Sequence, residues 1–124
     1  MTSVGEEITN TAQQRQQFSD YIKSVDPYKH PVVSHSISTE KESTYAPMLG
    51  RATFDGASLN GEPDDVFDAT LEWIQRSSDA GHKWIVTSDE QSPPGVGVEP
   101  DSFDPLHDNI RKNVLWGNVM AGGG

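Results

Sequence analysis

The 124-residue sequence contains no cysteine, so a disulfide framework and cysteine-based catalysis are both excluded. Basic residues are also scarce: nine Lys and Arg stand against 19 Asp and Glu, which gives a formal net charge of -10. This balance disfavours binding to a nucleic-acid backbone, because such binding depends on clustered positive charge. The lack of cysteine does not identify the cellular compartment, since exported proteins need not contain disulfides.

Long apolar runs are absent as well. Only 33% of the residues are hydrophobic and the mean hydropathy is -0.63, which is low for a domain that must build its own core. No stretch approaches the roughly 20 apolar residues of a membrane-spanning helix, so we expect no membrane insertion. The first residues, MTSVGEEITNT, have neither a basic region nor an apolar core. They therefore do not have the pattern of a signal peptide.

The first clear helical pattern lies near the N-terminus. Four apolar residues at helical spacing predict a helix and its buried face: Phe18, Tyr21, Ile22 and Val25. Thr11 with Gln14 fits a capping box at the start of this helix, and Asp26-Pro27 marks its end.

The rest of the chain alternates between strand and helix patterns. Strands are predicted over residues 31–37, within 50–61 and over 83–88, and helices over 39–49, over 63–81 and around 110–121. Thr39 and Glu42 fit a second capping box. Trp73 is most simply a helix-face packing residue. Trp84 and Trp116 are expected to pack in the core, with the lining of a sugar site as the alternative. The alternation favours an α/β fold, in which crossover helices connect the strands of a parallel sheet.

Three polar groups fall at the predicted carboxyl ends of strands, where parallel α/β proteins bind ligands. These groups are Glu6-Glu7, His35 and Asp89-Glu90. Two carboxylates that face each other across a site are what glycosidic bond cleavage requires, since one protonates the leaving oxygen and the other attacks or activates water. Each group also has an ordinary structural alternative: a helix-start charge, a hydrogen-bonded histidine, or a turn.

The remaining histidines and acidic residues match no metal motif. His30, His82 and His107 lack the spacing of a zinc site. The acidic residues at 101, 104 and 108 do not fit an EF-hand loop, and no His-Glu-x-x-His sequence is present. We therefore expect no metal, no other cofactor and no proteolytic activity. The Pro- and Gly-rich segment 92–105 is predicted to be a loop that projects from the carboxyl ends of the strands.

A family resemblance rests on five segments in order: VGEEITNT, SVDPYKHPVVSHS, LGRATFDGASLNG, AGHKWIVTSDEQ and IRKNVLWGNVMAGGG. Together they resemble successive blocks of bacterial, planctomycete-type glycoside-hydrolase-like proteins. Those proteins are (β/α)₈ barrels that are often named for a C-terminal collagen-binding domain, which this chain does not contain. The resemblance covers nearly the whole chain. It implies that residues 1–124 form one domain, a partial TIM barrel from the end of barrel strand 4 to just before barrel strand 8.

The resemblance also implies roles for individual residues. Glu7 takes the position of the acid/base and Glu90 that of the nucleophile of a retaining glycoside hydrolase. Glu6, His35 and Asp89 are the residues expected to contact the substrate. The sequence departs from the family where Thr2-Ser3-Val4 replaces Trp-Asn-Leu, where Glu6 replaces Asn at the position before the acid/base, and where Ile8 replaces Asn.

The implied partner is a carbohydrate, with no nucleic acid and no membrane. The parent enzyme is expected to be exported or periplasmic. The chain alone is expected to be inactive, because barrel strands 1 to 3 are missing, and its open sheet edges are expected to favour self-association. Two other classes stay open: a non-catalytic carbohydrate-binding fragment, and a small acidic α/β interaction protein.

Overall fold

The computed structural model describes residues 2–3, 10–91 and 98–124. Its sheet consists of β1 (Thr2–Ser3), β2 (Val32–Ser36), β3 (Gly56–Gly61) and β4 (Ile85–Gln91), in the order β1-β2-β3-β4. Every neighbouring pair of strands is parallel. The predicted α/β fold with a parallel sheet is therefore confirmed. Among the described residues the sheet is open and small, with β1 contributing only two residues, and no closed barrel is formed.

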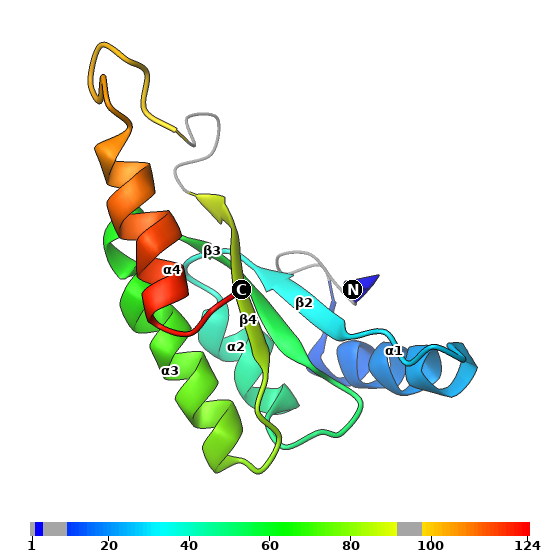
Figure 1. Cartoon of the computed structure of the whole chain (residues 1–124). Coiled ribbons are helices and arrows are strands. Elements are labelled where there is room, and N and C mark those ends of the chain that lie inside the picture. Colours follow the sequence, from blue (N-terminus) through cyan, green and yellow to red (C-terminus); the bar gives the residue numbers. More distant parts are fainter. Residues whose placement is uncertain (1, 4–9, 92–97) are drawn as a thin grey trace.

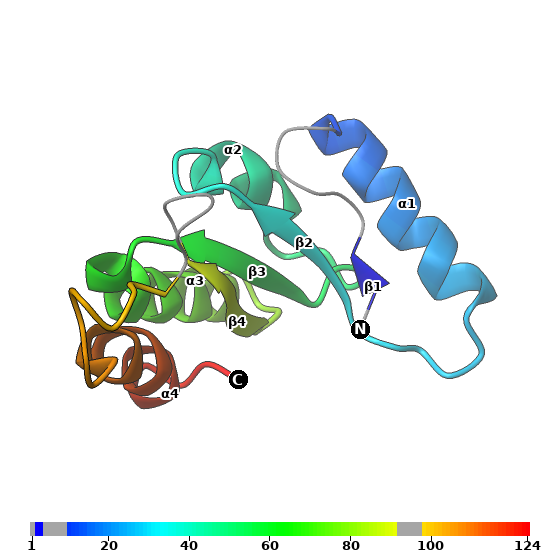
Figure 2. The ribbon, with the colours of Figure 1, turned by 90° about the horizontal axis from the view of Figure 1, so that it is seen from above.

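The helices alternate with the strands along the chain. They are α1 (Ala12–Val25), α2 (Lys41–Tyr45) with the 3₁₀ turn η1 (Ala46–Met48), α3 (Val66–Asp79) preceded by the 3₁₀ turn η2 (Pro63–Asp65), and the π-helix η3 (Ile110–Trp116) leading into α4 (Gly117–Met120). Viewed from above, all of these helices follow one face of the curved sheet (Figure 2). The opposite face carries no helix in the described part of the chain.

The hydrophobic core lies between the sheet and the helices (Figure 1). Its centre is aromatic: the rings of Tyr45 and Trp73 meet edge-on with centroids 5.1 Å apart, and Trp73 stacks on Trp84 at 6.2 Å. The strands contribute Val32, Leu59 and Val86 to the same cluster. The prediction that Trp73 and Trp84 are core residues is confirmed. For Trp116 it is wrong, because this residue is 57% exposed.

Local signals in the sequence set several element boundaries. Gln14 N donates to Thr11 Oγ1 and Thr11 N donates to the Gln14 side chain, so the predicted capping box of α1 is confirmed. The second predicted box is wrong, because Glu40 occupies the N-cap of α2 and makes no side-chain capping bond. The predicted strand over 83–88 begins and ends later, at Ile85 and Gln91.

The apolar stripe of α1 does not face the core as predicted. Only Ile22 packs against the core, whereas Phe18, Tyr21 and Val25 are 42%, 66% and 57% exposed. Arg15 and Ser19 are buried in their place. The Arg15 guanidinium donates to the backbone oxygen of Ser43 at 3.0 Å and to that of Asn10. The helix was predictable, but its orientation depends on contacts that only the tertiary structure provides.

Candidate functional site

The helix-free face of the sheet carries a row of polar side chains. Side chains on neighbouring strands that lie opposite each other point to the same face, and the register places His35 opposite Ser58 and Ser58 opposite Thr87. One step towards the carboxyl ends, Asn60 lies opposite Glu90. These residues therefore gather near the carboxyl edge of the sheet, where parallel α/β proteins place their ligand sites.

A register shift in β4 brings two carboxylates to this row. Leu59 pairs with Ser88 and Asn60 pairs with Glu90, so Asp89 is the extra residue between them. In a regular strand, successive side chains point to opposite faces of the sheet. A bulge redirects side chains locally and is common beside active sites. Here it allows both Asp89 and Glu90 to reach the same polar cluster.

The cluster consists of His35, Ser58, Asp89 and Glu90. His35 Nε2 lies 3.2 Å from Glu90 Oε2, and His35 Nδ1 lies 3.2 Å from Ser58 Oγ. Ser58 Oγ donates to Asp89 Oδ2 at 2.5 Å, and Asp89 Oδ1 is 3.7 Å from His35 Nδ1. The His35 side chain is 13% exposed, whereas the two carboxylates are each more than half exposed. The histidine is therefore fixed, and the carboxylates remain open to a ligand.

Hydrogen bonds link the side chains of this cluster into one network. Ser58 has one hydroxyl proton and gives it to Asp89, so its oxygen accepts from His35 Nδ1. Nε2 then faces an oxygen of Glu90 at hydrogen-bond distance, and such a contact needs a proton between the two atoms. His35 thereby joins the two carboxylates of the cluster, Glu90 directly and Asp89 through Ser58.

Tyr45 of α2 supports the cluster from the core side. Its hydroxyl donates to the backbone oxygen of Ser58 at 2.6 Å, and the residue is fully buried. Burial raises the pKa of the Tyr45 phenol, and the nearby charge of Asp89 adds to this shift. The phenol therefore stays protonated and keeps its hydrogen bond to the strand that carries Ser58.

Three of the predicted site residues are thus brought together: His35, Asp89 and Glu90. The other two, Glu6 and Glu7, lie outside the described residues, as do residues 92–97 of the predicted loop. The described part of that loop lies beyond the carboxyl end of β4 (Figure 1). The sequence did not predict Ser58 as a residue of the site. Its signal was the alternation of small polar residues with apolar ones over Gly56–Gly61, which places it on the face opposite Leu59.

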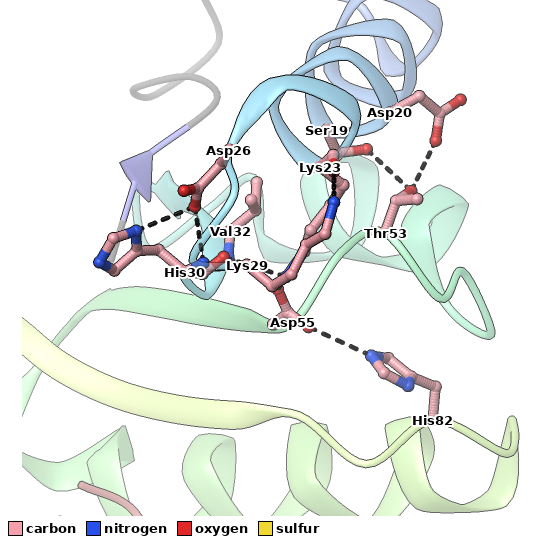
Figure 3. A network of polar contacts seen from close by, with 10 residues as sticks. All are labelled: Ser19, Asp20, Lys23, Asp26, Lys29, His30, Val32, Thr53, Asp55 and His82. Atoms are coloured by element: carbon pink, nitrogen blue, oxygen red, sulfur yellow. Dashed lines mark hydrogen bonds and ion pairs between the residues drawn. The ribbon is translucent and has the colours of Figure 1, made fainter.

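A second polar network lies at the other end of the strands (Figure 3). The Asp55 carboxylate accepts from Val32 N at 2.8 Å, pairs with Lys23 Nζ at 2.6 Å and lies 3.5 Å from His82 Nε2. It thereby joins α1, β2 and the segment before β4. Residues at the amino-terminal end of parallel strands generally contribute to stability and not to binding. We therefore assign this network a structural role.

Other features of the described residues offer no stronger site. A groove of about 380 Å³ lies between α3 and η3–α4, lined among others by Phe67, Trp116 and Met120. It is on the helical side of the sheet, away from the polar cluster. Within residues 2–3, 10–91 and 98–124, no group of three or more potential ligands is placed to hold a metal ion. No helix in this part of the chain is long and apolar enough to cross a membrane.

No protein-family model matches the chain, and neither a curated protein nor a solved structure matches it. The resemblance of the five sequence segments to glycoside-hydrolase-like barrels therefore stays a prediction. What the structure itself defines is an α/β protein with a polar cluster on the open face of a parallel sheet.

Proposed function

We propose that the chain is a segment of a (β/α)₈ barrel that carries part of the active site of a retaining glycoside hydrolase. Glu90 is the nucleophile, Glu7 is the acid/base, and the substrate is an oligosaccharide or polysaccharide. The observation that carries the proposal is the contact between Glu90 Oε2 and His35 Nε2 at the carboxyl edge of the sheet.

The arrangement of the sheet supports the barrel. Its strands are parallel and follow one another in sequence order, and the helices lie on one face only. A doubly wound sheet has helices on both faces and a change in strand order, whereas a barrel has neither feature.

The chemistry of the cluster supports the role of Glu90. A nucleophilic carboxylate must be ionised and held towards the anomeric carbon. The contact with His35 Nε2 fixes one oxygen of Glu90, which leaves the other free to attack. Asp89, which is held by Ser58, is placed to accept hydrogen bonds from sugar hydroxyls. The acidic residues Glu99, Asp101 and Asp104, in the segment that follows, favour neutral sugars over anionic ones.

The proposal can be tested by covalent trapping with dinitrophenyl 2-deoxy-2-fluoro glycosides of neutral sugars. A Glu90 oxygen attacks the anomeric carbon, and the bond to the dinitrophenolate breaks with its electron pair on the leaving group. A dinitrophenolate needs no proton to depart, so labelling depends on Glu90 and does not require Glu7. We expect a slowly formed glycosyl ester on Glu90, detected by peptide mass spectrometry, without turnover.

Two variants make this experiment specific. Glu90→Gln should remove the label, whereas Glu72→Gln, which changes an exposed glutamate of α3 on the helical side of the sheet, should retain it. A label on another carboxylate, or no label with any neutral sugar of the panel, would overturn the assignment of Glu90 as nucleophile.

A second candidate function is carbohydrate binding without catalysis. The half-exposed carboxylates on an open face favour it, because exposed acceptors can bind hydroxyls without excluding water. Calorimetry with neutral oligosaccharides separates the two functions. Binding that survives in Glu90→Gln, together with no covalent label in the wild-type chain, is the result expected for a binding module.

A further inference from the structure

We propose that the groove between α3 and η3–α4 is a second carbohydrate-binding site, which holds a neutral oligosaccharide or polysaccharide with Trp116 as its stacking platform. This site is separate from the cluster of His35 and Glu90. The choice of a carbohydrate as the ligand rests in part on the proposed function, whereas the site itself is defined by the side chains of the groove. Both walls of the groove are formed by described residues of this chain.

The tryptophan of this groove is left outside the hydrophobic core. Trp73 and Trp84 are buried in the core, whereas Trp116 is more than half exposed. It lines the groove together with Phe67 and Met120, whose side chains are also exposed. Exposed apolar side chains that gather in one groove mark a binding site for another molecule. Of the two roles expected for Trp116, core packing and the lining of a sugar site, the second is therefore the one that its position allows.

Polar side chains line the other end of the same groove. Asp64 of η2 and Asn113 of η3 meet across it, and Asn113 Nδ2 donates to Asp64 Oδ1 at 3.3 Å. Both residues are exposed, so the carboxylate and the amide are accessible to a ligand. Asn113 precedes Trp116 by about one helical turn, so these polar groups lie next to the indole ring.

This combination of groups fits a pyranose ring. A pyranose has an apolar face of C–H groups, which packs on a flat aromatic ring, and a rim of hydroxyl groups, which need hydrogen-bond donors and acceptors. Trp116 supplies the flat ring. Asp64 supplies acceptors, and the amide of Asn113 supplies both donors and an acceptor. The groove volume of about 380 Å³ falls within the range of small-molecule sites, about 300–1,000 Å³.

The charges around the groove favour a neutral ligand. Asp64 places a carboxylate in the groove, and the net charge of -10 repels anionic polymers. Lys112 also lines the groove and pairs with Asp108 at 3.0 Å. Its ammonium group disfavours a cationic ligand beside the indole. A neutral sugar meets neither penalty.

The polar end of the groove lies at the carboxyl edge of the sheet. β3 ends at Gly61, and the η2 turn that contains Pro63 and Asp64 follows after one residue. Asn60, just before Gly61, lies opposite Glu90 in the sheet register. A polysaccharide bound at the proposed active site can therefore continue over η2 into the groove. The groove would hold the chain of sugars at a distance from the residues that react with it.

The first test is native gel electrophoresis in the presence of three soluble neutral polysaccharides: galactomannan, xyloglucan and hydroxyethylcellulose. The acidic chain migrates towards the anode, and a neutral polymer retards it specifically when the two bind. We expect at least one of the three polymers to retard the wild-type chain, relative to a non-binding protein in the same gel. A chain that none of them retards would overturn the proposal.

Substitutions that keep the net charge test the role of the indole. Trp116→Ala should weaken binding at least about tenfold, as is typical for the loss of an aromatic anchor. Trp116→Phe keeps a flat ring and should bind more tightly than Trp116→Ala. The matched control is Tyr28→Ala, which removes an exposed aromatic ring outside the groove and should bind like the wild-type chain. Equal binding by Trp116→Ala and the wild-type chain, both folded by circular dichroism, would contradict the site.

Fluorescence locates the bound sugar. Because Trp73 and Trp84 are buried, Trp116 is the tryptophan whose emission a ligand in the groove shifts to shorter wavelength. The titrant is the hexasaccharide of the polymer that retards the chain. We expect the same shift in the wild-type chain and in Glu90→Gln. Binding without a change in emission, or binding that is lost in Glu90→Gln, would show that the sugar binds elsewhere.

The two proposals fail in distinguishable ways when both experiments use the wild-type chain. A covalent label on Glu90 without retardation supports the nucleophile and overturns the groove. Retardation that depends on Trp116, without a label, supports the groove and overturns the nucleophile. Calorimetry of Trp116→Ala then measures the binding of oligosaccharides at the cluster of His35 and Glu90 without the contribution of the groove.

Discussion

His35 Nε2 lies 3.2 Å from Glu90 Oε2, although the two residues are separated by 55 positions in the sequence. The contact exists because the parallel register places β2 and β4 on either side of β3, with Ser58 between them. The shift at Asp89 then turns Glu90 onto the face that His35 occupies. A fixed histidine therefore holds one oxygen of an otherwise exposed carboxylate.

This relationship predicts that His35 acts as a positioning residue for Glu90. His35→Phe removes the imidazole, so the Glu90 carboxylate loses the contact that fixes its orientation. We expect covalent labelling by the fluoroglycoside to slow at least about tenfold, within the range of positioned side-chain effects on proton-dependent chemistry. His30→Phe, at the opposite end of the strands, is the matched control and should label at the wild-type rate. Equal rates in both variants would contradict the role of His35.

Gly56 is required where β3 meets β4. A Cβ atom at this position would lie 2.1 Å from the backbone oxygen of Ile85, which cannot move without breaking the strand pairing. Gly56→Ala should therefore lower the free energy of unfolding by at least about 2 kcal/mol, in the range of overpacking substitutions. The measurement is urea denaturation followed by tryptophan fluorescence.

Gly61→Ala is the control within the same strand. Among the described residues, a Cβ atom at position 61 would meet only Val66 Cγ2, at an ordinary 3.6 Å. We expect the free energy of unfolding of this variant to lie within about 1 kcal/mol of the wild-type value, as is usual for a substitution that creates no clash. Equal losses in the two variants would show that the close approach of Gly56 to β4 is not the cause.

Tyr45 gives the chain a defined sensitivity to alkaline pH. Burial raises the pKa of its phenol in the folded state, whereas in the unfolded chain the phenol titrates near pH 10. The phenol therefore contributes stability that is fully present below about pH 10 and is lost as the pH rises towards the folded-state pKa. We expect the free energy of unfolding to fall between pH 8 and pH 11 as this contribution is lost.

Tyr45→Phe separates this contribution from that of the other titrating groups. At pH 8 the variant loses the hydrogen bond to Ser58 O, at a cost of about 1 kcal/mol. At pH 11 the difference in free energy of unfolding between the variant and the wild-type chain should be smaller, because phenylalanine has no proton to lose. Urea unfolding at both pH values measures this difference. A difference that stays constant or increases at pH 11 would contradict the role given to the Tyr45 phenol.

The sequence by itself determined the local elements. Thr11 and Gln14 cap α1, Asp26 ends it, and Gly81, with a φ of 86°, follows the end of α3 as predicted. These signals are readable because each depends on hydrogen bonds or backbone angles within a few residues of chain. The alternation of strands and helices, and with it the parallel α/β sheet, follows from the same local patterns.

The tertiary structure decided the rest. The burial of Arg15 in place of Phe18 depends on Ser43, a residue 28 positions away that accepts its hydrogen bond. The contact between His35 and Glu90 depends on the strand register and on one extra residue in β4. Neither can be predicted from the periodicity of a single strand. Burial and proximity are properties of pairs of segments, so a pattern read along one segment predicts its conformation but not the face that it turns to its neighbours.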